Sequence, residues 1–324
     1  AIPASSIKDI EIITTPSARY KTDGDVGIIN ITTKRALTAG WSGLLNLSSS
    51  THGTWNIDAI LNYRTGHHNF YVGTNLQDVA SRSNFTQEKT TLVDGIQTRS
   101  LADGLRWRDS YTRVAKAGWQ FAQDKHNLAL DFQYGQTSNW KGGDMNYDET
   151  RELVGAQGIS HNVFDAHDKY DLLKNLFQAA LTYTWKLTPK DQLDVTSRFR
   201  YDWGALEYTE SNMFVGNYRF EGTRGYEAEH HWDCDGTLAY KHSFNQHGKL
   251  ELGYQYTTYS EHGDYHIKYW DRDQQDFEWQ DDMYTPFYYR RQTHSVYGMI
   301  SDQIGKVSYD AGLRADHVID KVDI

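Results

Sequence analysis

The sequence is poor in proline, which restricts the backbone, and in cysteine, which forms disulfides: its 324 residues include four prolines and one cysteine. Because Cys234 stands alone, an internal disulfide framework and a cysteine-based zinc site are excluded. No apolar run approaches the ~18 residues of a membrane-spanning helix, and the mean hydropathy is −0.73. These values suit a soluble protein, but a barrel strand is apolar on one face only and also averages as polar.

Basic residues, export signals and catalytic motifs are scarce as well. The formal net charge of −10 argues against a nucleic-acid partner, which selects basic surfaces. Residues 1–4 have neither the basic start nor the apolar run of a signal peptide, so an exported protein would have lost its N-terminus. The sequence contains no nucleophile elbow, HExxH zinc motif, P-loop or dinucleotide fingerprint. We therefore expect neither an enzyme nor a bound cofactor.

Aromatic residues, by contrast, are abundant: 23 Tyr, 12 Phe and 10 Trp. From about residue 41 onward, large apolar residues alternate with small or polar ones, which indicates strands whose two faces meet different surroundings. Charge is nearly confined to one face, and an aromatic residue often ends the other, as in the aromatic girdle of a membrane barrel. The alternation is clearest at 57–63, 115–121, 128–134, 177–185, 193–201, 250–257 and 307–314.

The predicted connections alternate in length. Short polar turns fall at 66–69, 124–127, 189–191, 245–248 and 304–305. Long polar, aromatic segments lie between them, at 80–108, 138–172, 205–230 and 260–290. Short turns at one end and long loops at the other are typical of outer-membrane barrels. We count about eleven strands after residue 40 and predict an all-β fold, an antiparallel transmembrane β-barrel, with a soluble β-sandwich or propeller as the alternative.

The first forty residues differ from the rest. Residues 7–13 and 26–34 are predicted as two short strands joined by a segment that contains Pro16 and Gly24. This stretch resembles the C-terminal end of the plug domain in TonB-dependent outer-membrane receptors, and TPSARY at 15–20 is most similar to the Bacteroidetes-type branch of these barrels. The resemblance rests on Ile10-Glu11-Ile12, Pro16, Ala18-Arg19-Tyr20, Gly24, Gly27-Ile28-Ile29-Asn30-Ile31 and Lys34.

The resemblance implies that residues 1–36 end a plug domain and that residues 37–324 form the N-terminal half of a barrel of about 22 strands. It implies energised import of a scarce nutrient, such as a siderophore, haem, a glycan or a peptide, across the outer membrane of a Gram-negative bacterium. The implied partners are the outer-membrane lipids, the ligand and the TonB–ExbB–ExbD complex, which would act through N-terminal parts that this chain lacks. A surface-binding barrel without active uptake and a soluble β-rich binding module are the alternatives.

The most promising ligand-binding segment is the long connection 266–288. It combines aromatic residues, which stack on sugar rings or flat chelates, with carboxylates, which bind cations and sugar hydroxyls. A long loop packed against its neighbours would show the same composition. The candidate ligand-binding residues are Tyr269, Trp270, Asp273, Trp279, Asp281 and Tyr284.

Charged residues predict a second kind of contact, between plug and wall. Glu11 and Arg19 lie in the plug-like segment, whereas Arg198 and Arg200 lie on the predicted lumen face of a strand. A charge enclosed by the barrel needs a partner, so ion pairs between the two sets would hold the plug in place. Wall charges that simply face water in the lumen are the alternative.

One set of histidines has spacing that suits a metal. His262, Asp264 and His266 are two residues apart and would share one face of an extended strand. An exposed polar strand explains the same spacing, and we predict no metal site.

Overall fold

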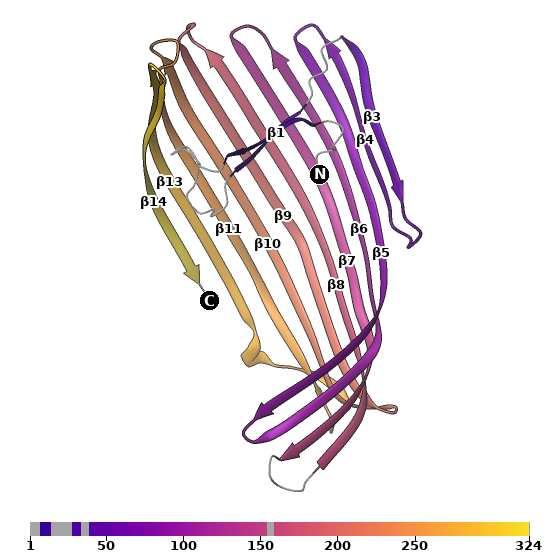
Figure 1. Ribbon diagram of the computed structural model, residues 1–324. Helices are drawn as coiled ribbons and strands as arrows, with labels where there is room; N and C mark the ends of the chain where they lie inside the picture. The colour runs from indigo at the N-terminus through magenta and orange to yellow at the C-terminus, as the bar shows by residue number, and fades with distance from the viewer. Residues whose placement is uncertain (1–6, 14–27, 34–38, 154–158, 324) are drawn as a thin grey trace.

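The computed structural model describes residues 7–13, 28–33, 39–153 and 159–323 (Figure 1). The first two strands, β1 (Ile7–Ile13) and β2 (Ile28–Thr33), pair antiparallel in a sheet of their own. Both strands predicted in the plug-like segment are therefore confirmed. The connection between them, with Pro16 and Arg19, lies outside the described residues.

The second sheet holds twelve antiparallel strands. Eleven of them are neighbours in chain order, which confirms the number predicted after residue 40, and the short β12 pairs beside β11. A 3-10 helix, η2 (Asp281–Met283), follows β12. The strands are β3 (Gly40–Ser49), β4 (Trp55–Thr65), β5 (His68–Val93), β6 (Ile96–Ala122), β7 (His126–Leu153), β8 (Ile159–Lys186), β9 (Asp191–Val215), β10 (Tyr218–Ser243), β11 (Lys249–Asp271), β12 (Asp276–Trp279), β13 (Thr285–Ile304) and β14 (Val307–Asp323).

The five short turns that the sequence predicts lie at one end of the sheet, at the top of Figure 1, where the long strands run side by side with a common tilt. They join β4 to β5, β6 to β7, β8 to β9, β10 to β11 and β13 to β14, as the sequence predicts. Gly66 and Gly305 in the first and last of these turns have φ values of 53° and 64°, which glycine adopts without strain.

The long connections differ from the prediction, because most of their residues belong to strands. The pairing of β5 with β6 continues from His68 opposite Phe121 to Val93 opposite Ile96, so the segment 80–108 is a strand hairpin. The segments 138–172 and 205–230 are extended in the same way around their hairpin tips. Beyond the apolar band both faces of a strand meet water, so the apolar–polar alternation fades although backbone pairing continues.

Residues directly opposite each other on neighbouring strands share a face of the sheet. One row joins Trp119, Leu130 and Leu181, and another joins Gln133, Gln178 and Arg200. We call these the apolar face and the polar face; in a membrane barrel they meet lipid and lumen respectively. None of the helical residues that the structure describes forms a segment long and apolar enough to traverse a bilayer.

One irregularity changes which side chains share the polar face. In β9, Gly204 and Ala205 together lie opposite Lys174 of β8, so β9 holds one extra residue there. Gly204 has a φ of 63° at this bulge. An extra residue reverses the alternation beyond it, so the odd-numbered Glu207 shares the face of the even-numbered Asp202.

Candidate ligand-binding surfaces

The polar face holds a buried ion cluster centred on Asp202, which is 1% exposed. Three nitrogen atoms surround its Oδ2 atom: Arg200 Nη2 at 2.7 Å, His231 Nδ1 at 2.8 Å and Lys174 Nζ at 3.3 Å. The four residues come from β8, β9 and β10. Because a buried carboxylate needs counter-charges, this cluster ties three neighbouring strands together.

Both arginines that we predicted to reach the plug have carboxylate partners on the wall. Arg200 belongs to the Asp202 cluster, and Arg198 bonds to Asp233 at 3.1 Å and to Asp235. Their predicted partners cannot be compared in the same way, since Arg19 lies outside the described residues and Glu11 is described only by its backbone. Ion pairs between plug and wall stay a prediction.

Further from the short turns, four glutamates gather on the polar face. Glu207 of β9 lies directly opposite Glu227 of β10, and Glu229 follows two residues later. The charge of Glu261 on β11 contributes to the raised pKa of Glu227. Glu261 also accepts a hydrogen bond from Tyr259 at 2.5 Å. We call Glu207, Glu227, Glu229 and Glu261 the glutamate cluster.

Crowding changes the acidity of this cluster, which lies outside the membrane. Glu227 is 16 residues from Ser243 at the turn end of β10, beyond the ~9–11 residues with which a strand crosses a bilayer. Burial first, then a hydrogen bond with Glu229 and the neighbouring carboxylate charges, raises the pKa of Glu227 to about 7. Glu227 therefore keeps its proton up to about neutral pH, and the cluster offers acceptors to a cation or to hydrogen-bond donors.

The predicted ligand-binding segment folds back on the end of β11, where β12 pairs with it. Trp270 has several partners there: its Nε1 donates to the Arg219 carbonyl at 3.0 Å, and its ring meets Phe277 edge-on with centroids 5.3 Å apart. The Arg219 guanidinium also lies 4.5 Å from the centroid of the Trp270 ring. Trp270 is thus built into an arginine–aromatic stack.

Trp279 and Tyr284 come together around one histidine. Their rings lie 5.5 Å and 4.4 Å from the His266 ring, and they are 52% and 45% exposed. Tyr269 is separated from this pair, because it lies opposite Glu278 and adjacent residues of a strand point to opposite faces.

Two predicted ligand residues lie beyond the strands. Asp273 occupies the turn after β11, where its backbone N–H donates to Asp271 Oδ1 at 2.7 Å. The side chain of Asp281 is not among the described ones. Ligand contact at all six predicted residues stays a prediction.

The three residues with metal-like spacing do not converge. His266 Nε2 bonds to Asp264 Oδ2 at 3.2 Å, whereas His262 stacks on His230 with centroids 5.3 Å apart. In the part of the chain that the structure describes, no group of three or more His, Cys, Asp or Glu is arranged to hold a metal ion.

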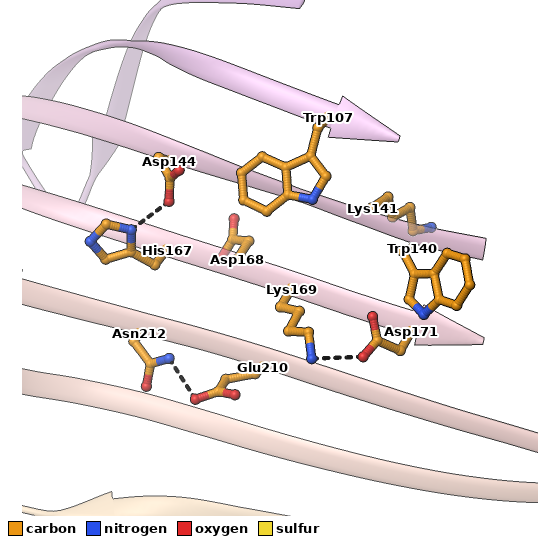
Figure 2. A pocket seen from close by; sticks show the side chains of 10 residues that line it. All are labelled: Trp107, Trp140, Lys141, Asp144, His167, Asp168, Lys169, Asp171, Glu210 and Asn212. Carbon is orange, nitrogen blue, oxygen red and sulfur yellow. Dashed lines mark hydrogen bonds and ion pairs between the residues drawn. The ribbon is translucent and has the colours of Figure 1, made fainter. Parts of the chain in front are cut away.

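A cleft of about 530 Å³ lies across β6, β7, β8 and β9, beyond the apolar band (Figure 2). Figure 2 shows Trp107 and Trp140 along one side, with Glu210 and Asn212 across Lys169 from them. Gly142 lets Trp107 take its place in the lining: a Cβ atom there would overlap the Trp107 ring and the carbonyl of Asp168. The hollow therefore depends on a glycine at this position.

Our sequence analysis missed the glutamate cluster and the cleft. Glu227 and Glu229 are two residues apart, so their shared face was readable from the sequence. Glu207 joins them only through the register of β9 against β10 and the bulge before it, which no local pattern shows. The cleft combines residues from four strands and depends on the same register.

Comparison with known proteins supports the membrane assignment. Residues 207–323 match the outer membrane protein beta-barrel family, over a little more than a third of the chain. No curated protein matches the sequence.

Two solved structures are similar to the chain. One is the Ralstonia pickettii toluene transporter TbuX, which is 11% identical over 88% of this chain and 90% of that chain, with a TM-score of 0.23. The other is the siderophore receptor PirA from Pseudomonas aeruginosa, 12% identical over 99% of this chain and 81% of that chain, with a TM-score of 0.22. At these TM-scores the two likenesses establish neither fold nor function.

The family match agrees with the antiparallel meander, its long strand extensions at one end and its two unlike faces. A soluble sandwich or propeller is therefore set aside. The chain is an antiparallel transmembrane β-barrel wall of the outer membrane of a Gram-negative bacterium.

Proposed function

We propose that the chain belongs to a TonB-dependent receptor that imports a scarce nutrient with energy from the inner membrane. The observation that carries the proposal is the polar face, where the Asp202 cluster and the glutamate cluster follow one another outward from the membrane level. Such densely charged lining suits a water-filled, plugged lumen, because charge at membrane depth needs partners or water. We expect a receptor without catalytic activity.

The proposal assigns residues 1–36 to the end of the plug and residues 37–324 to the N-terminal half of the barrel wall. Support comes from the separate sheet of β1 and β2 and from the sequence resemblance of this region. In the described sheet, β3 and β14 are the edge strands. An unpaired edge in lipid costs several kcal/mol for each open backbone group, so both edges pair with further strands of the receptor in this proposal.

The ligand is proposed to be a siderophore, haem, a glycan or a peptide, released inward when the TonB–ExbB–ExbD complex pulls on the plug. The glutamate cluster favours ligands that present positive charge or hydrogen-bond donors.

The test is uptake of defined nutrients by cells with and without the full-length receptor, each with an active or an inactive TonB system. Import should disappear when the receptor is absent and also when the TonB system is inactive. A Glu227→Gln/Glu229→Gln double variant should weaken uptake, whereas Glu88→Gln should not, since Glu88 is in an exposed pair with Arg99. Ligand binding that persists with no uptake in any strain would instead favour a surface-binding barrel.

A further inference from the structure

The cleft in Figure 2 opens away from the lumen. Trp107 and Lys169 both lie opposite Gly142, and Glu210 lies opposite Lys169, so these side chains share one face. The next row on the same face pairs Trp140 with Asp171, on the side that continues the apolar face. A ligand in this cleft would lie outside the proposed import route.

The cleft lies above the hydrocarbon layer. Trp140 is 14 residues beyond His126, the first residue of β7. At ~3.4 Å per residue and a tilt of ~40°, this places it about 35 Å from the short turns, whereas the apolar band is ~25 Å tall. The cleft is therefore level with the headgroups and sugars of the outer leaflet.

Two indole rings give the cleft flat apolar surfaces. Trp140 is 43% exposed and is supported by Tyr111, with ring centroids 5.5 Å apart. Trp107 lies against Gly142, where no side chain intervenes. Aromatic faces of this kind stack on the C–H faces of sugar rings.

Most of the polar side chains around the rings already contact one another, and the other two that line the cleft also have partners: Lys141 lies over the Tyr170 ring at 3.7 Å and Asp168 accepts a hydrogen bond from Ser211. The pairs are Asp144 with His167 at 2.6 Å, Asp171 with Lys169 at 2.7 Å, and Glu210 with Arg224 at 3.1 Å. Because these carboxylates are already paired, they leave little free negative charge to bind a cation. Several carboxylates close together would also repel an anionic ligand. The electrostatics favour a neutral ligand.

Two buried acceptors in the cleft have no donor among the described residues. Asn212 is 6% exposed and donates its Nδ2 to Glu210 at 2.9 Å, while its Oδ1 has no partner. Asp171 uses Oδ2 for Lys169 and leaves Oδ1 without a partner. Buried acceptors call for donors, and sugar hydroxyls supply them beside a ring face.

We infer that this cleft binds a neutral sugar unit within the saccharide portion of the glycolipid that fills the outer leaflet. The cleft opens away from the lumen and lies level with the headgroups and sugars of the outer leaflet. Both features favour the glycolipid as the ligand over a nutrient that passes through the lumen. The site does not depend on import, so its test uses binding alone.

The experiment is isothermal titration calorimetry on the full-length protein in detergent. Three probes separate the sources: the intact outer-leaflet glycolipid, its lipid A after mild acid removes the core sugars, and the released core oligosaccharide. The variants are Trp140→Ala and Asn212→Ala. Trp41→Ala is the matched control, because Trp41 is 70% exposed on β3, far from the cleft.

Each of the two sugar-bearing probes, the oligosaccharide and the intact glycolipid, should bind the Trp41→Ala variant as tightly as the wild type. Each should bind both cleft variants at least tenfold more weakly than the wild type. If Asn212→Ala fails to fold, Trp140→Phe should give an intermediate loss, because it retains a smaller ring. Equal binding of lipid A and intact glycolipid, or oligosaccharide binding that Trp140→Ala leaves unchanged, would overturn the inference. So would the absence of oligosaccharide binding to the wild type.

Discussion

Tyr297 of β13 lies across Gly253 of β11, its direct cross-strand partner, and donates its hydroxyl to Glu251 at 2.8 Å. The same arrangement joins Tyr71 to Gly118, and the Tyr71 hydroxyl also bonds a carboxylate. In both places the glycine lets an aromatic ring lie flat on the polar face. The hydroxyl then holds a carboxylate in position: Glu251 on the strand of the glycine for Tyr297, and Asp131 on the strand beyond the glycine for Tyr71.

Replacing Gly253 by alanine should destabilise the barrel by about 1–3 kcal/mol, because the new methyl group overlaps the Tyr297 ring and displaces it. Urea unfolding in detergent measures the change. Gly236→Ala is the matched control, since the nearest atom to its added methyl is the Thr196 carbonyl oxygen at 4.0 Å. Equal losses for the two variants would show that the ring contact is unimportant.

The assignment of the two faces makes a second prediction. Leu130 lies between Trp119 and Leu181 on the apolar face, so Leu130→Arg should cost about 2–4 kcal/mol and impair assembly. Gln133→Arg, on the polar face of the same strand, should be mild. Assembly is followed by the heat-sensitive mobility of folded barrels on gels. Equal tolerance of both arginines would refute the assignment.

Much of this wall was predictable because one physical constraint shaped it. Lipid on one side and water on the other forces the period-2 pattern, so segments such as 128–134 and turns such as Gly66 identified strands and hairpins without the structure. The same constraint ends at the headgroups. Beyond the headgroups the hydrogen bonds between β5 and β6 continue to Val93, but the alternation of apolar and polar residues no longer reveals the strands.

The Asp202 cluster makes a third prediction. Asp202→Asn removes the counter-charge that Arg200 and Lys174 share and the acceptor that His231 contacts, and should cost about 3–5 kcal/mol in the free energy of unfolding. Asp148→Asn, in an exposed pair with His161, should cost about 1 kcal/mol or less. Denaturant titration of both variants provides the comparison. A mild effect at Asp202 would mean that Arg200 and Lys174 are well hydrated without it.

Acidity gives the fourth prediction. The pKa of Glu227 is raised from its usual 4.5 to about 7 in the folded chain, mainly by burial. Between these values the folded protein holds a proton that the unfolded chain has lost, so the free energy of unfolding should fall as pH rises through this window. Glu227→Gln should remove this fall and make the variant the more stable protein above pH ~7.

Thermal melting at about pH 5 and about pH 8 measures this slope. Glu88→Gln is the reference, because Glu88 lies in an exposed pair with Arg99 and should leave the pH dependence unchanged. A Glu227→Gln variant with the same pH slope as the wild type would show that this carboxyl does not hold the proton.

The functional surfaces were less predictable than the strands, for reasons that particular residues show. Asp202 and Glu207 share a face only because β9 carries an extra residue at Gly204. Trp107 and Asn212 are more than a hundred positions apart and meet through the register of three strand pairs. Composition pointed to the segment 266–288, yet the register separates Tyr269 from Trp279 and Tyr284 there.

The strand extensions beyond the membrane have a consequence for affinity. A side chain displayed on a paired strand has already lost most of its backbone freedom, so a ligand need not order a loop before it binds. Binding should therefore resemble docking to a preformed surface, with little change in main-chain protection from hydrogen exchange. Substitutions at well-separated positions of this surface should then combine additively.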